Sequence, residues 1–132
     1  MSRPQEGVLD TSAVIALPTL RPEKLPAEPV ITAITLAELS VGPLVAPDES
    51  VRAARQVVLQ QAESDFEALP FDSAAARAFG RVSSSLREAG RKHKARAYDA
   101  LIAAVALSRG LPVYTLNADD FRGIDGLEVH EL

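Results

Sequence analysis

The sequence predicts one α/β domain of three layers, in which a mostly parallel central sheet is covered by helices on both faces. Short apolar segments of strand length alternate along the chain with longer segments whose apolar residues recur every three or four positions, as on one face of a helix. The chain has 132 residues, of which 47% are hydrophobic, so residues 1–132 can bury the core of a single domain.

The first predicted strand is the apolar run Gly7–Leu9. It stops at Asp10-Thr11-Ser12, three residues that favour the start of a helix, and the helix itself is predicted over 13–17. An irregular connection follows, because proline recurs there at Pro18, Pro22, Pro26 and Pro29. A second strand is predicted at Val30–Ile31.

Three helices are predicted in the middle of the chain. The first covers 35–45, where Thr35-Leu36-Ala37-Glu38 matches a capping box and Gly42-Pro43 ends or bends the helix. The second covers 48–68 and has one apolar face, formed by Val51, Ala54, Val58 and Ala62. After a short connection or strand at 69–71, Asp72 caps the third helix, which stops at Gly90. Its core face consists of Ala75, Phe79, Val82 and Leu86.

A buried helix is predicted over 97–109, because the segment is nearly all apolar apart from Asp99 and Ser108 and is followed by Gly110. A strand at 112–116, a turn at 117–122 and a last strand at 127–130 complete the chain. In parallel sheets of this kind, ligands bind at the carboxyl ends of the strands. Asp10 and Asn117 both fall at that edge.

The composition excludes several kinds of site. The chain contains no cysteine, which excludes a thiolate zinc site and a cysteine nucleophile. No apolar run approaches the roughly 18 residues of a membrane span. The first seven residues also lack the apolar core of a secretory signal. We therefore expect a cytoplasmic protein that has no membrane partner.

The net charge of −4 is unevenly distributed along the chain. Residues 77–96 carry a net charge of +6, against −10 for the rest. The basic residues of this segment are Arg77, Arg81, Arg87, Arg91, Lys92, Lys94 and Arg96. A compact basic stripe can attract phosphates even on an acidic protein, because salt screens the more distant charges. The alternative interpretation is an ordinary solvated helix face.

Three acidic residues lie inside apolar segments: Asp10, Glu38 and Asp99. Each has a structural interpretation when taken alone, since Asp10 suits a helix N-cap, Glu38 a capping box and Asp99 the positive end of a helix dipole. Together they fall at helix starts or strand ends on one edge of the predicted sheet. Three carboxylates in a poorly solvated pocket need a positive charge or protonation. Oxygen ligands without cysteine favour Mg²⁺ or Mn²⁺.

Four motifs carry a family resemblance. They are Leu9-Asp10-Thr11-Ser12, then Ile34-Thr35-Leu36-Ala37-Glu38-Leu39 with Gly42, then Asp99-Ala100-Leu101-Ile102-Ala103-Ala104, and last Thr115-Leu116-Asn117-Ala118-Asp119-Asp120-Phe121. In this order within one small chain, they resemble the motif set of PIN-domain ribonuclease toxins of VapBC toxin–antitoxin pairs. The resemblance runs from about residue 8 to the end of the chain and implies a PIN-like α/β/α fold.

The resemblance also implies roles for the site residues. Asp10 and Asp99 would bind Mg²⁺ directly, and Glu38 would bind it directly or through water. Thr11, Ser12 and Thr115 would be supporting hydroxyls. Asn117 stands in the catalytic set where many relatives have a fourth Asp, which leaves a second metal in doubt. Asp119 or Asp120 would compensate, but a turn or cap role is favoured for Asp120.

The implied reaction is hydrolysis of an RNA phosphodiester by a metal-activated water, with Glu38 as the water-orienting base. The basic residues beside Asp99, namely Arg87, Arg91, Lys92, Lys94 and Arg96, would guide the RNA backbone. His93 lies among them and is interpreted as a surface residue or a phosphate contact. The resemblance further implies a homodimer and a cognate antitoxin, for which the two helices of residues 48–86 offer apolar surface.

Two other functions agree with part of the sequence. A catalytically silent PIN domain that binds RNA or a protein partner is compatible with the Asn117 departure. A phospho-acceptor receiver domain is also small, acidic and Mg²⁺-binding, but it needs an acceptor Asp at the end of a central strand and a Lys after a later one. Thr115-Leu116-Asn117 offers no such Lys.

Overall fold

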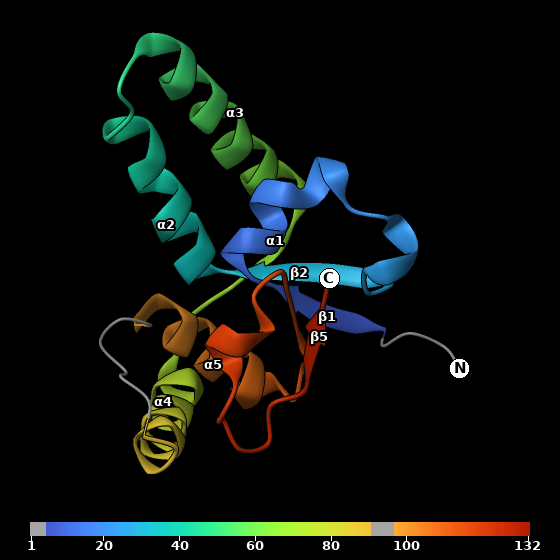
Figure 1. Ribbon diagram of the computed structural model, residues 1–132, viewed down its shortest axis with the longest axis vertical. Helices are drawn as coiled ribbons and strands as arrows, with labels where there is room; N and C mark the ends of the chain where they lie inside the picture. Colours follow the sequence, from blue (N-terminus) through green and yellow to red (C-terminus); the bar gives the residue numbers. More distant parts are fainter. Residues whose placement is uncertain (1–4, 91–96) are drawn as a thin grey trace.

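The computed structural model describes residues 5–90 and 97–132 of the protein (Figure 1). Within these residues, five strands form one sheet in the order β3-β2-β1-β4-β5, and every pairing is parallel. The strands are β1 (Glu6–Leu9), β2 (Glu28–Thr32), β3 (Ala68–Leu69), β4 (Val113–Thr115) and β5 (Val129–Glu131). The predicted α/β fold with a parallel central sheet is confirmed.

The strand order places a topological switch point between β1 and β4. From β1 the chain builds the sheet outward through β2 and β3, and it then returns to the other side of β1 for β4 and β5. Val8 of β1 pairs with Val30 on one side and with Val113 on the other. Open α/β sheets bind ligands beyond the carboxyl ends of the strands at such a point. Asp10 follows β1 there, and Thr115 ends β4.

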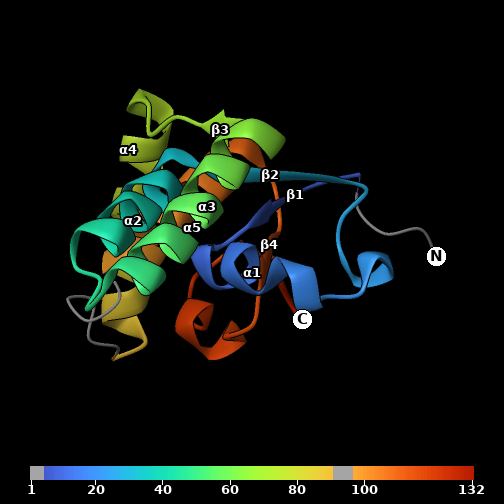
Figure 2. The same ribbon diagram turned by 90° about the horizontal axis from the view of Figure 1, so that it is seen from above.

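Helices cover both faces of the sheet, as Figures 1 and 2 show. The helices are α1 (Thr11–Ala16), α2 (Ala33–Leu44), α3 (Glu49–Asp65), α4 (Ser73–Glu88) and α5 (Ala97–Arg109). The α4–α5 pair lies on one face, whereas α1, α2 and α3 lie on the other (Figure 1). The three-layer arrangement therefore matches the prediction.

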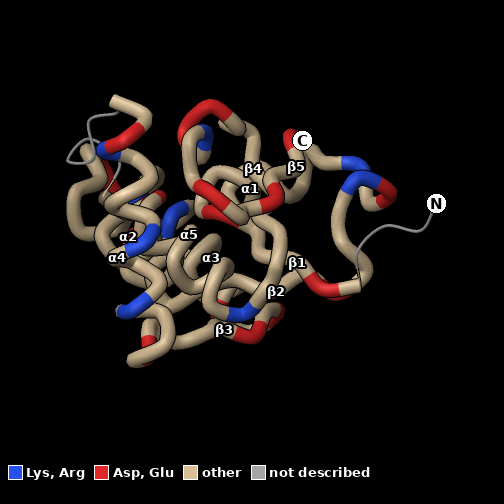
Figure 3. The backbone as a smooth tube through the Cα atoms, turned by 90° about the horizontal axis from the view of Figure 1, so that it is seen from below, with Lys and Arg blue, Asp and Glu red and all other residues tan. Residues whose placement is uncertain are grey.

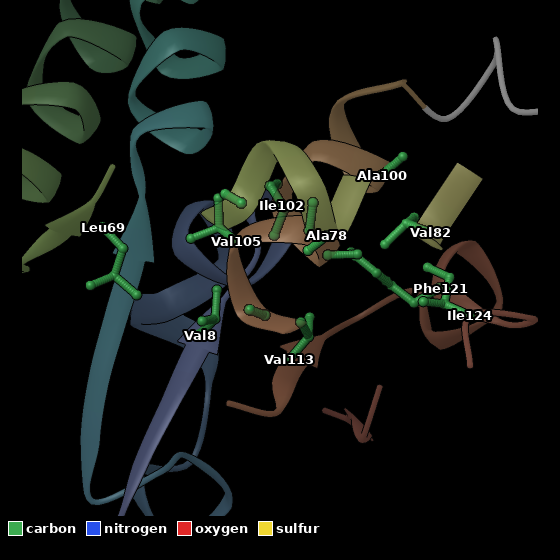
Figure 4. Close-up of a cluster of buried hydrophobic side chains, with 14 of the residues drawn as sticks. Val8, Leu69, Ala78, Val82, Ala100, Ile102, Val105, Val113, Phe121 and Ile124 are labelled. Atoms are coloured by element: carbon green, nitrogen blue, oxygen red, sulfur yellow. The ribbon is translucent and has the colours of Figure 1, made fainter. Parts of the chain in front are cut away.

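Buried apolar side chains of the sheet, α4 and α5 form the core on the α4–α5 face (Figure 4). Val8 and Val113 of the strands pack with Ile102 and Val105 of α5, and none of the four has any exposed surface. Phe121, from a short 3₁₀ helix at Ala118–Phe121, closes one end of this core. Because successive residues of a strand point to opposite faces, Leu9 packs into the second core with Ala13 of α1 and Leu39 of α2.

Several element boundaries differ from those predicted. Helix α2 starts at Ala33, because the Thr32 side chain caps it by accepting a hydrogen bond from the Thr35 N–H at 3.4 Å. Pro43 lies inside the last turn of α2, and the helix ends one residue later. Helix α3 stops at Asp65 because Ala68 pairs with β2. The last strand begins two residues later than predicted, at Val129.

Helix α1 starts two residues earlier than predicted, at Thr11, because Asp10 caps it, whereas the predicted starts of α3 and α4 and the predicted ends of α4 and α5 agree with the structure. Asp48 and Asp72 cap α3 and α4 through hydrogen bonds from the backbone N–H groups of Val51 and Ala75. Gly90 and Gly110 follow α4 and α5 with φ values of +71° and +66°, the left-handed conformation expected of a helix-ending glycine. Among the described residues, no helix is both long enough and apolar enough to span a membrane.

Candidate active site

Asp10 lies at the switch point and is almost completely buried, with 3% of its surface exposed. It is the N-cap of α1, because its Oδ1 accepts a hydrogen bond from the Ala13 N–H at 3.0 Å. The same oxygen accepts from the Ser12 hydroxyl at 2.7 Å, and Oδ2 accepts from the Thr115 hydroxyl at 2.6 Å. The capping interpretation is thus correct, but a cap needs only one of these bonds. The others fix the carboxylate in one orientation.

Glu38 is turned toward the start of α1 and not toward the start of its own helix. Its Oε1 accepts a hydrogen bond from the Thr11 hydroxyl at 2.5 Å, and the Thr11 and Thr35 hydroxyls lie 3.0 Å apart. The capping box predicted for Thr35 and Glu38 is therefore wrong, since Thr32 caps α2. Glu38 has been brought to Asp10 from another part of the chain.

The pKa of Glu38 is raised above its ordinary value, chiefly because burial penalises the charged form. The hydrogen bond from Thr11 lowers this pKa, and the negative charge of Asp10 raises it. Two carboxylates therefore lie close enough to repel each other. No Lys or Arg among the described residues forms an ion pair with either one.

Hydroxyl groups join the ends of β1 and β4 around Asp10. Besides its bond to Asp10, the Thr115 hydroxyl accepts from the Asn117 N–H at 2.9 Å, and the Ser12 hydroxyl accepts from the Leu116 N–H at 3.3 Å. Thr11, Ser12 and Thr115 thus lie beside the carboxylates, as predicted for supporting hydroxyls. Asn117 itself is exposed, and its contact with this network is made by its backbone.

Asp99 lies in the first turn of α5 and is half-buried. Helix α5 contacts α2, the helix that carries Glu38. In residues 5–90 and 97–132, however, no three acidic or histidine side chains are grouped so as to hold a metal ion. The structure thus pairs Asp10 with Glu38 and does not include Asp99 in a closed cluster with them. The role of Asp99 as a third ligand stays a prediction.

The donor chemistry of the paired carboxylates fits a hard divalent cation. Oδ1 of Asp10 accepts two hydrogen bonds and Oδ2 accepts one, which leaves a lone pair of Oδ2 for an ion. Among the described residues, the side chains that hydrogen-bond to Asp10 and Glu38 do so through hydroxyl groups. The possible ligand atoms are therefore carboxylate and hydroxyl oxygens, which favour Mg²⁺ or Mn²⁺ over zinc. A cation would also offset the repulsion between Asp10 and Glu38.

Two acidic residues, Asp119 and Asp120, lie in the turn that follows β4. Asp119 forms an ion pair with Arg122 at 2.9 Å, and both side chains are largely exposed. Asp120 lies with Asp119 in the 3₁₀ turn, which agrees with the favoured turn interpretation. These contacts give Asp119 a structural partner at the surface of the turn.

Only part of the predicted RNA-binding segment is described. Arg87 is exposed in the last turn of α4, and Figure 3 marks the Lys and Arg positions of this helix in blue. Arg91, Lys92, Lys94 and Arg96 lie outside the described residues, as does His93. That these basic residues guide the RNA backbone therefore stays a prediction.

A cavity of about 460 Å³ opens beside Glu38. Thr11 and Glu38 line it together with the apolar side chains Ile15, Leu39 and Val58, and its remaining lining residues are Gly42 and Arg55. No sequence pattern singles out Arg55, because a lone Arg on the polar side of an amphipathic helix has no local signature of function. A second, apolar cavity of about 170 Å³ lies between α1 and α3.

Comparisons with known proteins agree with this architecture. The family model described as PIN domain matches residues 7–127. The chain belongs to the PIN domain family. It is 44% identical to Ribonuclease VapC5 of Mycobacterium tuberculosis over 126 residues, covering 93% of this chain and 90% of the relative. It is 30% identical to Ribonuclease VapC1 of Rickettsia felis, with 92% of each chain covered.

Solved structures give the same result for the fold. A crystal structure of VapBC-5 from Mycobacterium tuberculosis, a member of the VapBC family of toxin–antitoxin systems, matches with a TM-score of 0.85 at 41% identity. The match covers 98% of this chain and all of that chain. DNA-bound VapBC from Salmonella typhimurium matches with a TM-score of 0.78 at 28% identity, covering 99% and 98% of the two chains. The resemblance to PIN-domain toxins of VapBC pairs is confirmed.

Proposed function

We propose that this PIN-domain protein is a Mg²⁺-dependent endoribonuclease and the toxin of a toxin–antitoxin pair. The observation that carries the proposal is the pairing of buried Asp10 with half-buried Glu38 at the switch point of the sheet. The curated relatives named as ribonucleases support the reaction class. Asp10, Glu38 and Asp99 would hold Mg²⁺, or Mn²⁺ in its place.

Asp10 and Glu38 would have different roles in the reaction. A bound divalent cation would lower the pKa of a water molecule and would neutralise charge on the phosphoryl oxygens. Asp10 is held by Ser12 and Thr115, so its oxygens stay in place without reorganisation. Glu38 binds Thr11 through Oε1, and we assign to Oε2 the acceptance of a proton from the attacking water. Its raised pKa makes it a better base for that step.

Cleavage of total RNA with Mg²⁺, and again with EDTA, tests this function. We expect cuts in the presence of Mg²⁺ that EDTA abolishes and that Asp10→Asn or Asp99→Asn removes. Glu63→Gln, at an exposed position of α3, is the matched control and should cut like the parent. Absence of metal-dependent cleavage of any RNA by the parent protein would favour the silent PIN domain. Mapping the cut ends would identify the substrate class.

The antitoxin partner has support from the solved relatives, several of which are toxin–antitoxin complexes. We propose that it covers the largely apolar cavity between α1 and α3, whose lining includes Val14, Ile15, Leu17, Val58 and Phe66 beside the polar residues Gln61 and Asp65. The side chain of Ile15 at its rim is 58% exposed. Among the described residues, the exposed large hydrophobic side chains include Val57 of α3 but none of α4. The apolar face of α4 is therefore core, and the surface predicted for residues 48–86 is reduced to α3.

Co-expression with the product of a short reading frame directly upstream tests this docking site. Ile15→Glu should reduce the amount of complex recovered, because a charge at the rim of an apolar cavity opposes burial. Leu44→Glu is the matched control, since Leu44 is 84% exposed at the end of α2 and does not line the cavity. If the parent, Ile15→Glu and Leu44→Glu gave equal amounts of complex, the partner would dock elsewhere. Light scattering of the toxin alone tests the proposed homodimer.

A further inference from the structure

Arg55 is held across the gap between two neighbouring helices. Helices α2 and α3 run side by side (Figure 1), and Arg55 of α3 donates a hydrogen bond from Nη1 to the Gly42 carbonyl of α2 at 3.0 Å. The stem of Arg55 lies on Gly42, where an added Cβ would lie 3.3 Å from Cδ of the arginine. These two contacts tie the exposed side chain of Arg55 to α2.

A second arginine on the same helix shows that this arrangement is specific to Arg55. Arg52 forms a two-pronged ion pair with Glu49 at 2.9 and 2.7 Å, at the exposed start of α3. Arg55 forms no ion pair with any described acidic side chain. A guanidinium has five N–H donors, and the bond to Gly42 uses one of them. The fixed cation of Arg55 is thus suited to an external anion.

The cavity that Arg55 lines is the one that contains Glu38. Its volume of about 460 Å³ lies within the range of small-molecule sites and is sufficient for a nucleotide. Thr11 and Glu38 lie on one part of its lining, and Ile15, Leu39 and Val58 supply apolar wall between the helices. The cavity therefore combines a catalytic carboxylate, an apolar wall and a cation.

We propose that this cavity is a nucleotide subsite for the RNA strand, in which Arg55 binds a phosphate next to the scissile one. The proposal rests on the ribonuclease function proposed above. An Arg–phosphate contact is charge-assisted and directional, and the apolar wall can contact the adjoining ribose and base. Arg55 is a substrate-positioning residue on this account.

Binding of a fluorescently labelled, single-stranded RNA of mixed sequence, measured by anisotropy in EDTA, tests the subsite without cleavage. Arg55→Met keeps the aliphatic stem on Gly42 and removes the charge. We expect it to weaken RNA binding about tenfold and to reduce the slope of log K against log salt by about 0.7, the value for one lost phosphate contact on a single strand. Arg55→Lys should recover part of both losses.

Two variants sharpen the result. Arg52→Met removes one positive charge from the same helix but not from the cavity, and it should change RNA binding less than about twofold. Ile15→Ser removes apolar wall and should weaken binding about threefold with an unchanged salt slope, because an apolar contact releases no counterions. Equal losses in Arg52→Met and Arg55→Met, or parental binding by Arg55→Met, would overturn the subsite.

The same proteins separate failure of the subsite from failure of the ribonuclease function. If the parent cuts RNA with Mg²⁺ while Arg55→Met binds RNA like the parent, the nuclease function stands and the subsite is wrong. If RNA binding depends on Arg55 but the parent never cuts, the subsite stands as part of a silent RNA-binding domain. Circular dichroism of each variant confirms that a loss of binding is not a loss of fold.

Discussion

The two ends of helix α5 face different chemical surroundings. Toward its middle and end, the helix packs on α4 and the sheet through fully buried apolar side chains such as Ile102 and Val105. Its start carries Asp99 and belongs to the predicted catalytic edge. Among the described residues, the buried polar side chains other than Ser85 are Asp10, Thr32, Thr35 and Thr115, and they all lie at or beside that edge. The α4–α5 core is thus largely apolar, whereas the sheet edge that carries Asp10 and Glu38, here called the carboxylate edge, is polar and charged.

This contrast shows how one small domain separates stability from function. The α4–α5 core buries mainly apolar side chains, so it stabilises the fold directly. The carboxylate edge holds two repelling charges in place by hydrogen bonds, an arrangement that opposes folding and serves a ligand. Substitutions in the core should therefore change stability, and substitutions at the edge should change activity.

The largest expected effect is that of Asp10→Asn on RNA cleavage. Asn also caps helices, so the start of α1 should be kept while a charged ligand is lost. We expect the Mg²⁺-dependent rate to fall about a thousandfold, equal to about 4 kcal/mol of activation free energy. Single-turnover assays measure the cleavage rate, and far-UV circular dichroism measures whether the helices are kept. A variant that is folded and fully active would refute the proposed role of Asp10.

The next largest effect is expected in the core. Ile102→Ala removes a side chain that has no exposed surface and should lower the free energy of unfolding by about 3 kcal/mol, through lost burial and a cavity. Urea unfolding measures the loss. Cleavage per folded molecule should be unchanged, and a large drop in that specific rate would show that the core and the edge are not separate.

A smaller effect is expected where β1 lies under the ring of Tyr114. A Cβ added at Gly7 would lie 2.6 Å from Cε1 of Tyr114 and 3.1 Å from Cβ of Pro26. Gly7→Ala should therefore destabilise the fold by about 2 kcal/mol, the usual range for an overpacked core. Thermal unfolding checks this value, and an unchanged melting temperature would show that the ring of Tyr114 moves freely. His130 stacks on that ring at 4.5 Å and would have to shift with it.

The smallest effect should have the opposite sign. Because burial and Asp10 raise the pKa of Glu38, the folded protein holds this proton more tightly than the unfolded chain, and ionisation opposes folding. Stability should fall as the pH rises through the ordinary value of 4.5 toward the raised pKa. Glu38→Gln in EDTA should thus be more stable than the parent at pH 7, by less than about 1 kcal/mol after solvent screening.

The pH dependence supplies the control for that variant. At a pH well below 4.5 the side chain is neutral in both states, so the parent and Glu38→Gln should unfold at the same urea concentration. If Glu38→Gln were instead less stable than the parent at pH 7, the hydrogen bond from Thr11 would outweigh burial and repulsion.

The sequence predicted those features whose signals are local. Helix α5 has the bounds that its apolar run and Gly110 indicated, and Asp48 and Asp72 cap the helices they precede. The start of α2 was misplaced because two threonines, Thr32 and Thr35, both suit a cap, and only the sheet decides between them. For residues 69–71 the sequence left a connection and a strand open, and the structure forms a two-residue strand at Ala68–Leu69. Only the pairing with β2 defines so short a strand.

For the candidate site as well, the sequence predicted residues that belong to local motifs and missed contacts between distant segments. The order of the motifs placed Asp10 and Glu38 together, and the structure pairs them. The bond that turns Glu38 away from its own helix joins residues 27 positions apart, and no local pattern encodes it. Arg55 was missed for the same reason, because its contact with Gly42 joins two helices. Tertiary contacts, and not residue types, define these features.

Binding of Mn²⁺ to the protein, followed by electron paramagnetic resonance in place of Mg²⁺, tests the central claim most directly. We expect the parent and Glu63→Gln to bind the ion alike, and Asp10→Asn to bind it at least about tenfold more weakly, because a charged oxygen ligand is lost. Equal affinity of the parent and Asp10→Asn would contradict the claim that the carboxylate edge is a cation site.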